Sequence, residues 1–364
     1  MHALLDKTLA HLRALVGFDT RNPPRAIGTG GIFDYLRAQL PGFEVEVTDH
    51  GAGAVSLIAT RGKPKLLFNV HLDTVPDSPQ WSASPFELRV TDDRAIGLGA
   101  CDIKGAAAAL LAAANASGGD MALLFTTDEE GADPRCVRAF LKDGRAFANV
   151  IVAEPTRCEA VLAHRGIQSV RARFEGRAGH ASVEQKPTDS ALHRAVRWSA
   201  AALDFAEARA NEAFGGLQGM RFNLGRIEGG IKANMMAPEA ELRFGMRPLP
   251  SVDMDGLLDH LRTLVEPEPA AFEETFRGPP LPANCADANS RLQEAGSFAG
   301  ACGIPVGRAV DFWTEAALFS QAGCTTFVYG PGDIAQAHTA DEWVSLDELA
   351  LAARTYLRIT EKAS

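Results

Sequence analysis

The sequence has 364 residues, of which 46% are hydrophobic and 23% are charged. At about 100 to 200 residues per domain this length predicts two or three domains, and the ordinary globular composition excludes a disordered tail or a disulfide-stapled miniprotein. Lys and Arg total 36 against 46 Asp and Glu, which gives a formal net charge of −10. Nucleic-acid and anionic-membrane binders need a basic surplus, so we expect neither partner.

The cysteine pattern and the N-terminus both indicate a soluble, cytoplasmic protein. The 6 cysteines are scattered without a C-x-x-C pair and are expected to be reduced. Leu5, Leu9, Leu12 and Val16 recur at helical spacing, and charged residues interrupt them, so we expect an amphipathic first helix and no signal peptide. The longest apolar run, residues 106–114, is about half the length that crosses a bilayer.

The first part of the chain alternates short apolar strands with helical stretches, an order that predicts a mainly parallel sheet covered by helices. The expected strands are 43–48, 55–60, 65–70, 121–126 and 149–153. The clearest helix is alanine-rich and covers 103–115. Beyond the middle of the chain, a helix at 290–301, a strand at 325–329 and a helix at 346–359 return to the same α/β domain.

The middle of the chain follows a different order, β-α-β-β-α-β, which is ferredoxin-like. Its expected elements are strand 167–174, helix 189–209, strands 220–227 and 240–246, helix 253–265 and strand 271–276. Segment 277–282 is rich in proline and can continue neither a strand nor a helix, so we predict that it is a linker back to the first domain. We therefore expect an α/β catalytic domain, residues 1–165 plus 278–364, with an inserted α+β domain at 166–277.

Carboxylates and imidazoles follow the predicted strand ends, where ligands collect in open α/β sheets. The group comprises His71, Asp73, the run Asp128 to Glu130, Glu154 and His338, with Asp102 just before the alanine-rich helix. Singly, each has an ordinary explanation, such as an N-cap or a solvated acidic loop. Together, the carboxylates would repel one another without a cation, so the pattern predicts a divalent metal site.

The types of ligand at this site narrow the choice of metal. Imidazole and carboxylate ligands suit Zn, Co, Mn or Ni. The candidate ligands exceed the three that a single catalytic zinc usually takes, so two ions that share one carboxylate are the simplest arrangement. Asp102, which is centrally placed among the candidates, is the natural bridge.

Several short motifs occur in a fixed order along the chain. They are His71 to Pro76, Gly99 to Gly105, Thr127 to Gly131, Ala153 to Thr156, Gly179 to Ser182, and Gly330 to Gly332 followed by Ala337 and His338. In this order they resemble the M20 metallopeptidase and deacylase family, over nearly the whole chain and including the opening segment 18–24. The resemblance implies a catalytic domain of the zinc exopeptidase type with an inserted dimerisation or lid domain.

The resemblance also assigns metal ligands by position. It makes Asp102 the bridging carboxylate, His71 and Glu154 ligands of one metal ion, and Glu130 and His338 ligands of the other. The implied cofactors are two divalent metal ions, Zn or Co.

Further roles follow from the same resemblance. Glu129 would be the general base, and Asp73 would orient His71 by a hydrogen bond, as metal-bound imidazoles generally require. His180 would reach the active site of the partner subunit and help stabilise the oxyanion, which implies a homodimer through the inserted domain. Asn234 and Arg247 match positions that bind the substrate's carboxylate, although a surface salt bridge explains Arg247 about as well.

The implied reaction is hydrolysis of a small-molecule N-acetyl amino acid to acetate and the free amino acid, in arginine biosynthesis. Thr314-Glu315-Ala316 resembles the acetylornithine deacetylase branch, and the whole chain is similar to the N-acetyl-L-citrulline deacetylase relatives of that branch. N-acetyl-L-citrulline and N-acetyl-L-ornithine are therefore the expected substrates. A dipeptidase or carboxypeptidase using the same metals remains an alternative, as does a non-catalytic metal-binding assembly protein, which would not need Glu129 beside the ligands.

Overall fold

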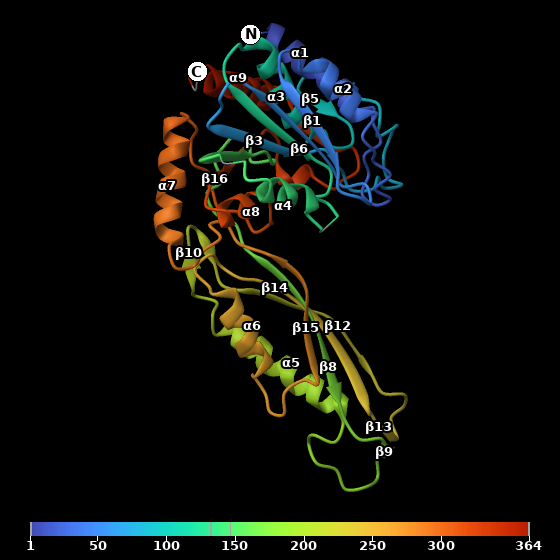
Figure 1. The fold of residues 1–364 in the computed structure, drawn as a ribbon. Coiled ribbons are helices and arrows are strands. Elements are labelled where there is room, and N and C mark those ends of the chain that lie inside the picture. Colours follow the sequence, from blue (N-terminus) through green and yellow to red (C-terminus); the bar gives the residue numbers. More distant parts are fainter. Residues whose placement is uncertain (1, 132, 146, 363–364) are drawn as a thin grey trace. The chain divides into compact units, whose positions relative to one another are not determined.

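The computed structural model describes residues 2–131, 133–145 and 147–362. The chain divides into two compact units, and the second is inserted into the sequence of the first (Figure 1). Unit 1 comprises Met1–Leu162, Ser290–Arg308 and Thr314–Ser364, and unit 2 comprises Ala163–Asn289 and Ala309–Trp313.

Unit 1 is built on a six-stranded mixed sheet in the order β1-β2-β6-β3-β7-β16. The strands are β1 (Glu44–Asp49), β2 (Val55–Arg61), β3 (Leu66–His71), β6 (Met121–Thr126), β7 (Asn149–Val152) and β16 (Thr325–Val328). The pairings β6 with β3, β3 with β7 and β7 with β16 are parallel, whereas both pairings of β2 are antiparallel. β3 and β6 are buried along their whole length, as expected for apolar strands in the middle of a sheet. The predicted mainly parallel α/β sheet is confirmed.

Three long helices of unit 1, α1 (His2–Val16), α3 (Lys104–Ala116) and α9 (Leu346–Lys362), pack against one another. The alanines of α3 are small and buried, so its neighbours can lie close to it. The N-cap of α3 is Ile103, which means that Asp102 precedes the helix without capping it. The remaining elements are α2 (Ile32–Gln39), α4 (Arg135–Lys142), α7 (Ala288–Ala301), α8 (Ala316–Gln321), the 3-10 turn η1 (Ile334–Gln336), and the small sheet of β4 (Arg89–Val90), β5 (Arg94–Ile96) and β17 (Trp343–Ser345).

Unit 2 contains the expected β-α-β-β-α-β order as a four-stranded antiparallel sheet, β12-β14-β8-β15. Its elements are β8 (Ile167–Glu175), α5 (Ala191–Glu207), β12 (Arg221–Gly229), β14 (Glu239–Arg247), α6 (Met254–Arg262) and β15 (Ala271–Gly278). The buried Trp198 of α5 lies 4.9 Å from Phe244 of β14 between ring centroids and donates a hydrogen bond to the backbone oxygen of Leu261. This tryptophan therefore joins both helices to the sheet.

Two short two-stranded ladders extend unit 2. β9 (Gly179–His180) pairs with the sequence-distant β13 (Met235–Met236), and β10 (Ala213–Phe214) forms a hairpin with β11 (Leu217–Gln218). Gly215 and Gly216 join β10 to β11 with φ of 55° and 93°, the left-handed conformation that a two-residue hairpin turn favours.

The predicted linker at 277–282 is wrong at its beginning. Arg277 and Gly278 pair with Gln168 and Ile167, so β15 continues to Gly278. Glycine is unfavourable in a strand but does not prevent pairing. The strand ends only before Pro279 and Pro280, which have no N–H group to donate to a neighbouring strand.

Within the described part of the chain, no helix combines the length and the apolar composition that crossing a membrane requires.

Replacing Trp198 with alanine should lower the free energy of unfolding by about 3–5 kcal/mol, because it removes a large buried side chain that joins three elements. Urea denaturation followed by circular dichroism measures this change. His193→Ala, an exposed position on the same helix, is the matched control and should change stability by about 0.5 kcal/mol or less. Equal effects of the two substitutions would contradict the assignment of Trp198 to the core.

Candidate metal centre

The expected metal ligands of unit 1 come together in two groups that share Asp102. One group is His71, Asp102 and Glu154, and the other is Asp102, Glu130 and His338, each with its ligand atoms within 4.8 Å of one another. In the described part of the chain, these are the groups of three or more His, Cys, Asp or Glu side chains arranged to hold a metal ion.

The parallel strands explain why residues distant in sequence meet here. His71 is the last residue of β3, Glu130 follows β6, and Glu154 follows β7. Because parallel strands end at the same edge of a sheet, their following residues lie close together. Asp102 is contributed by the loop before α3, and His338 by the segment after η1.

The two carboxylate oxygens of Asp102 face different imidazoles. Oδ1 lies 3.2 Å from Nε2 of His71, and Oδ2 lies 3.4 Å from Nε2 of His338. The outer members lie close as well: Nε2 of His338 is 3.0 Å from Oε1 of Glu130, and Nε2 of His71 is 3.9 Å from Oε1 of Glu154. This is the arrangement that a carboxylate bridging two cations requires.

The two groups differ in exposure. All three members of the His71 group are buried, whereas the His338 side chain is 52% exposed. A ligand therefore has access to the centre from the side of His338, while His71 and Glu154 line its inner part.

Burial and charge act against one another at these carboxylates. Burial raises the pKa of Glu154 well above its usual value, the charge of His71 opposes this, and the charge of Asp102 adds to it. At Asp102, burial also disfavours ionisation, but hydrogen bonds with His338 and His71 outweigh it and hold the pKa below its usual value. Divalent cations would satisfy these crowded acids, and the mixture of imidazole and carboxylate donors fits Zn, Co, Mn or Ni.

Asp73 contacts His71 through its backbone oxygen and its carboxylate. Nδ1 of His71 lies 3.0 Å from the backbone oxygen of Asp73 and 3.5 Å from its carboxylate. The buried carboxylate also accepts hydrogen bonds from the side chain of Asn22, at 2.9 Å, and from the backbone N–H of Glu130, at 3.1 Å. Asp73 therefore ties the segments of two expected ligands together.

Asn22 was not singled out from the sequence. The available signal was its place in the opening segment 18–24, which resembles the family without indicating a role.

Two further glutamates lie in this region. Glu129 is partly buried next to Glu130, and burial raises its pKa well above its usual value. His71 opposes this shift, whereas Glu130 and Asp102 add to it. Glu315 is buried and accepts a hydrogen bond from the hydroxyl of Thr126 at 3.0 Å, and its pKa is raised to about 8, chiefly by burial. No sequence pattern indicated that Glu315 is buried.

The expected site residues of unit 2 lie at two ends of one strand. His180 on β9 is exposed, and its Nδ1 lies 2.7 Å from the Ser182 hydroxyl. Asn234 belongs to the same end, since its backbone oxygen accepts a hydrogen bond from Ala181. Arg247 is the last residue of β14, a nine-residue strand whose first residue, Glu239, follows β13 by three residues. At about 3.3 Å per residue, β14 spans about 26 Å between Glu239 and Arg247.

Arg247 is half-buried. Burial lowers the pKa of its guanidinium, the charge of Asp311 opposes this shift, and the charge of Arg165 adds to it. The buried Arg165 donates hydrogen bonds to the backbone oxygens of Gly219 and Gln218 and pairs with Asp311.

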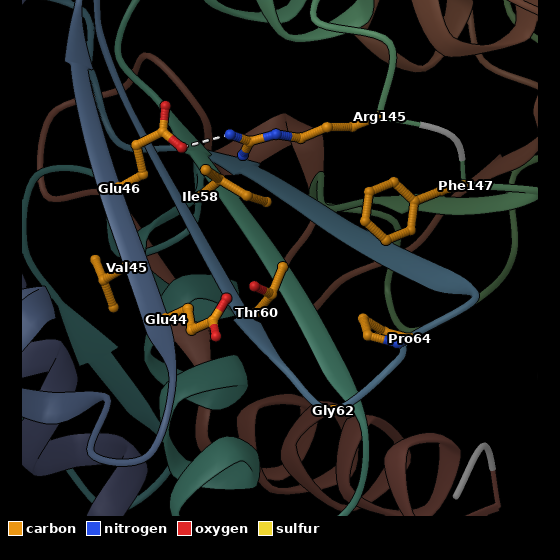
Figure 2. Close-up of a pocket in the computed structure, with 9 residues that line it drawn as sticks. All are labelled: Glu44, Val45, Glu46, Ile58, Thr60, Gly62, Pro64, Arg145 and Phe147. Carbon is orange, nitrogen blue, oxygen red and sulfur yellow. Dashed lines mark hydrogen bonds and ion pairs between the residues drawn. The ribbon is translucent and has the colours of Figure 1, made fainter.

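A surface pocket of about 550 Å³ in unit 1 offers different chemistry (Figure 2). It is lined by Glu44, Val45, Glu46, Ile58, Thr60, Gly62, Pro64, Arg145 and Phe147. Figure 2 shows Glu46 paired with Arg145, and the lining contains neither an imidazole nor a thiol. The metal centre is therefore the stronger candidate for catalysis.

Comparison with known families agrees with this site. Residues 67–362 match the model of peptidase family M20/M25/M40. The chain belongs to this family.

Among curated M20 relatives, N-acetyl-L-citrulline deacetylase from Xanthomonas campestris pv. campestris is 66% identical over 351 residues, which cover 96% of each chain. Acetylornithine deacetylase from Vibrio vulnificus is 31% identical over 325 residues, which cover 84% of each chain. The similarity to the first relative extends over nearly the whole length of both proteins.

Solved structures confirm the M20 fold. Aminopeptidase PepT from Bacillus cereus has a TM-score of 0.75 at 20% identity, covering 99% of this chain and 98% of that one. The YXEP protein from Bacillus subtilis, described as a dinuclear metal-binding peptidase of the M20 family, has a TM-score of 0.67 at 15% identity, covering 99% and 98%. These similarities support the fold class expected from the sequence.

Asp102→Ala should remove both metal ions, whereas His71→Ala should remove one, because Asp102 belongs to both ligand groups. Inductively coupled plasma mass spectrometry of Co²⁺-loaded, desalted protein measures the number of ions per chain. His193→Ala, exposed in unit 2, is the control and should match the wild type. Full occupancy of both sites in Asp102→Ala would contradict a shared bridging carboxylate.

Proposed function

We propose that this protein is a metal-dependent deacetylase that hydrolyses N-acetyl-L-citrulline to acetate and L-citrulline, as a step of arginine biosynthesis. The observation that carries the proposal is the pair of ligand groups sharing Asp102, with Glu129 beside them. The choice of substrate rests on the 66% identity to an N-acetyl-L-citrulline deacetylase. The 31% identity to an acetylornithine deacetylase makes N-acetyl-L-ornithine the second candidate substrate.

In this proposal two divalent cations, Zn or Co, would be held by the two ligand groups, with Asp102 shared between them. His71 and Glu154 would complete the ligands of one ion, and Glu130 and His338 those of the other. When bound, such ions lower the pKa of water and polarise the carbonyl of the acyl group.

Glu129 acts as the general base and acid. It accepts a proton from the attacking water and returns this proton to the amide nitrogen as the C–N bond breaks. The products are acetate and a free amine, so protons and bonds balance without a further reactant. Asp73 maintains the geometry, because it holds both His71 and the backbone of Glu130.

We further propose that the protein acts as a homodimer through unit 2. Asn234 and Arg247 lie at opposite ends of the nine-residue β14, too far apart to hold one substrate carboxylate within a single subunit. Two subunits would resolve this difficulty, because Arg247 could then come from one subunit and His180 and Asn234 from the other. His180 would then stabilise the oxyanion.

The surface of unit 2 also supports a dimer. β12 is the last strand at one edge of its sheet. Ile227 on this strand, and Val196 and Leu203 on α5, are 46%, 56% and 41% exposed. An edge strand beside exposed apolar side chains is typical of a surface that pairs with another chain.

We place the protein in the cytoplasm, since all six cysteines are free thiols and four of them are buried.

The proposed substrate is tested by measuring amine release from N-acetyl-L-citrulline, N-acetyl-L-ornithine and a set of dipeptides, each with Co²⁺- or Zn²⁺-loaded protein. The highest kcat/KM should be that of N-acetyl-L-citrulline. A preference for dipeptides would favour the peptidase alternative, and no activity on any substrate would favour the non-catalytic alternative.

Glu129→Gln should lower kcat by about 100- to 10,000-fold, the range typical of a lost general base, while both ions remain bound. Steady-state kinetics together with metal analysis separates the two effects. An active variant with full metal content would remove Glu129 from this role.

Mixing the variants His180→Ala and Glu129→Gln should restore activity, although each is nearly inactive alone. In a hybrid dimer one active site receives Glu129 from one subunit and His180 from the other, so random reassortment should give about a quarter of wild-type activity. Mixing after mild dissociation, followed by kinetics, measures this recovery. No recovery in demonstrated hybrid dimers would contradict action of His180 across the subunits.

A further inference from the structure

The loop that carries Asp102 is held by one buried side chain, Glu342, which is 1% exposed. Oε1 of Glu342 accepts hydrogen bonds from the backbone N–H groups of Cys101 and Asp102, both at 2.8 Å. Oε2 accepts a third from Gly99 at 3.0 Å. The backbone oxygen of Glu342 accepts another bond from Gly97, also at 3.0 Å. The loop is thus attached to Glu342 along most of its length.

We infer that Glu342 is a positioning residue that fixes the bridging carboxylate of Asp102 and thereby determines how tightly the centre binds both metal ions. The inference deepens the proposed function and rests on its metal centre. The Glu342 side chain belongs to neither ligand group, and its carboxylate accepts hydrogen bonds from backbone N–H groups. It acts through the backbone of Asp102.

The position of Glu342 explains why its effect reaches both ions. Glu342 follows His338 by four residues, so its carboxylate connects the segment of one expected ligand to the loop of another. The two oxygens of Asp102 face the imidazoles of His71 and His338 at 3.2 and 3.4 Å. A shift of the Asp102 backbone would therefore change the geometry of both ligand groups.

A buried carboxylate is costly unless donors surround it, and a loop with three converging N–H groups supplies them. The same three N–H groups would be left without an acceptor if the carboxylate were removed, which favours a rearranged loop. A purely structural carboxylate would stabilise the fold equally with and without metal, whereas a positioning carboxylate should change metal affinity. This difference makes the inference testable.

The substitution Glu342→Gln keeps the size of the side chain but brings an amide N–H₂ group against at least one backbone N–H group. Glu342→Asp keeps the charge and withdraws the carboxylate by one methylene. Asp341→Asn is the matched control, since Asp341 is the adjacent residue and its carboxylate contacts Ser82 and Arg89 at the surface. Its φ of 54° suits asparagine well.

Metal-free protein is titrated with Co²⁺, and binding is followed by visible absorption of the bound ion and by calorimetry. Both Glu342 variants should bind Co²⁺ about 10- to 100-fold more weakly, the usual effect of losing a residue that orients a ligand, with kcat largely recovered at saturating Co²⁺. Asp341→Asn should bind like the wild type. The rise in melting temperature on adding Co²⁺ should also shrink in the Glu342 variants, because weaker binding stabilises the folded state less.

Unchanged Co²⁺ affinity and an unchanged spectrum in Glu342→Gln would overturn the inference. The same holds if the variant loses equal stability with and without Co²⁺, since Glu342 would then serve the fold alone. If Glu342→Gln does not fold, Glu342→Asp decides between these outcomes. A wild-type protein that binds no Co²⁺ would overturn the proposed function and this inference with it, so the two failures are distinguishable without any substrate.

Discussion

Electrostatic repulsion at one edge of the unit 1 sheet is the constraint on which the rest of the site depends. Asp102 has a ligand atom within 4.8 Å of Glu154 in one group and of Glu130 in the other, and all three side chains are largely removed from water. Such a cluster is unfavourable in water-free surroundings unless positive charge lies between its members. Imidazoles on both sides of Asp102 supply part of this charge, and the geometry leaves the remainder to cations.

The fold gathers these acids through strand direction and then holds them by hydrogen bonds from distant segments. β3, β6 and β7 end at one edge of the sheet, which fixes the approximate positions of His71, Glu130 and Glu154. The finer geometry depends on two carboxylates that we do not assign to the metal. Asp73 joins the His71 segment to the backbone of Glu130, and Glu342 holds the loop of Asp102. Such supporting contacts restrict the ligands to the geometry that a metal ion needs.

In unit 2, the length of β14 determines how far apart the candidate site residues lie. β14 separates Arg247 from the β9–β13 ladder, beside which Asn234 lies, so under the proposed function a complete active site needs residues from two subunits. The exposed apolar residues of α5 and β12 provide a surface suited to that association. Oligomerisation would then be part of the chemistry, because the oxyanion and the substrate carboxylate would be bound by different chains.

The sequence by itself determined the local and ordered features of this protein. The apolar strands, the alanine-rich helix and the β-α-β-β-α-β order follow from residue periodicity and turn composition, which act over short distances. The set of candidate metal ligands followed from their positions after strands and from the order of their motifs.

The tertiary structure decided which distant segments contact one another. Asn22 meets Asp73 from 51 residues away, and Glu342 meets Asp102 from 240 residues away. Pairing with β8 carries β15 through Arg277 and Gly278, where proline and glycine predicted a linker. These contacts depend on which segments the fold brings together, and hydrogen bonds between distant segments leave no periodic pattern in the chain.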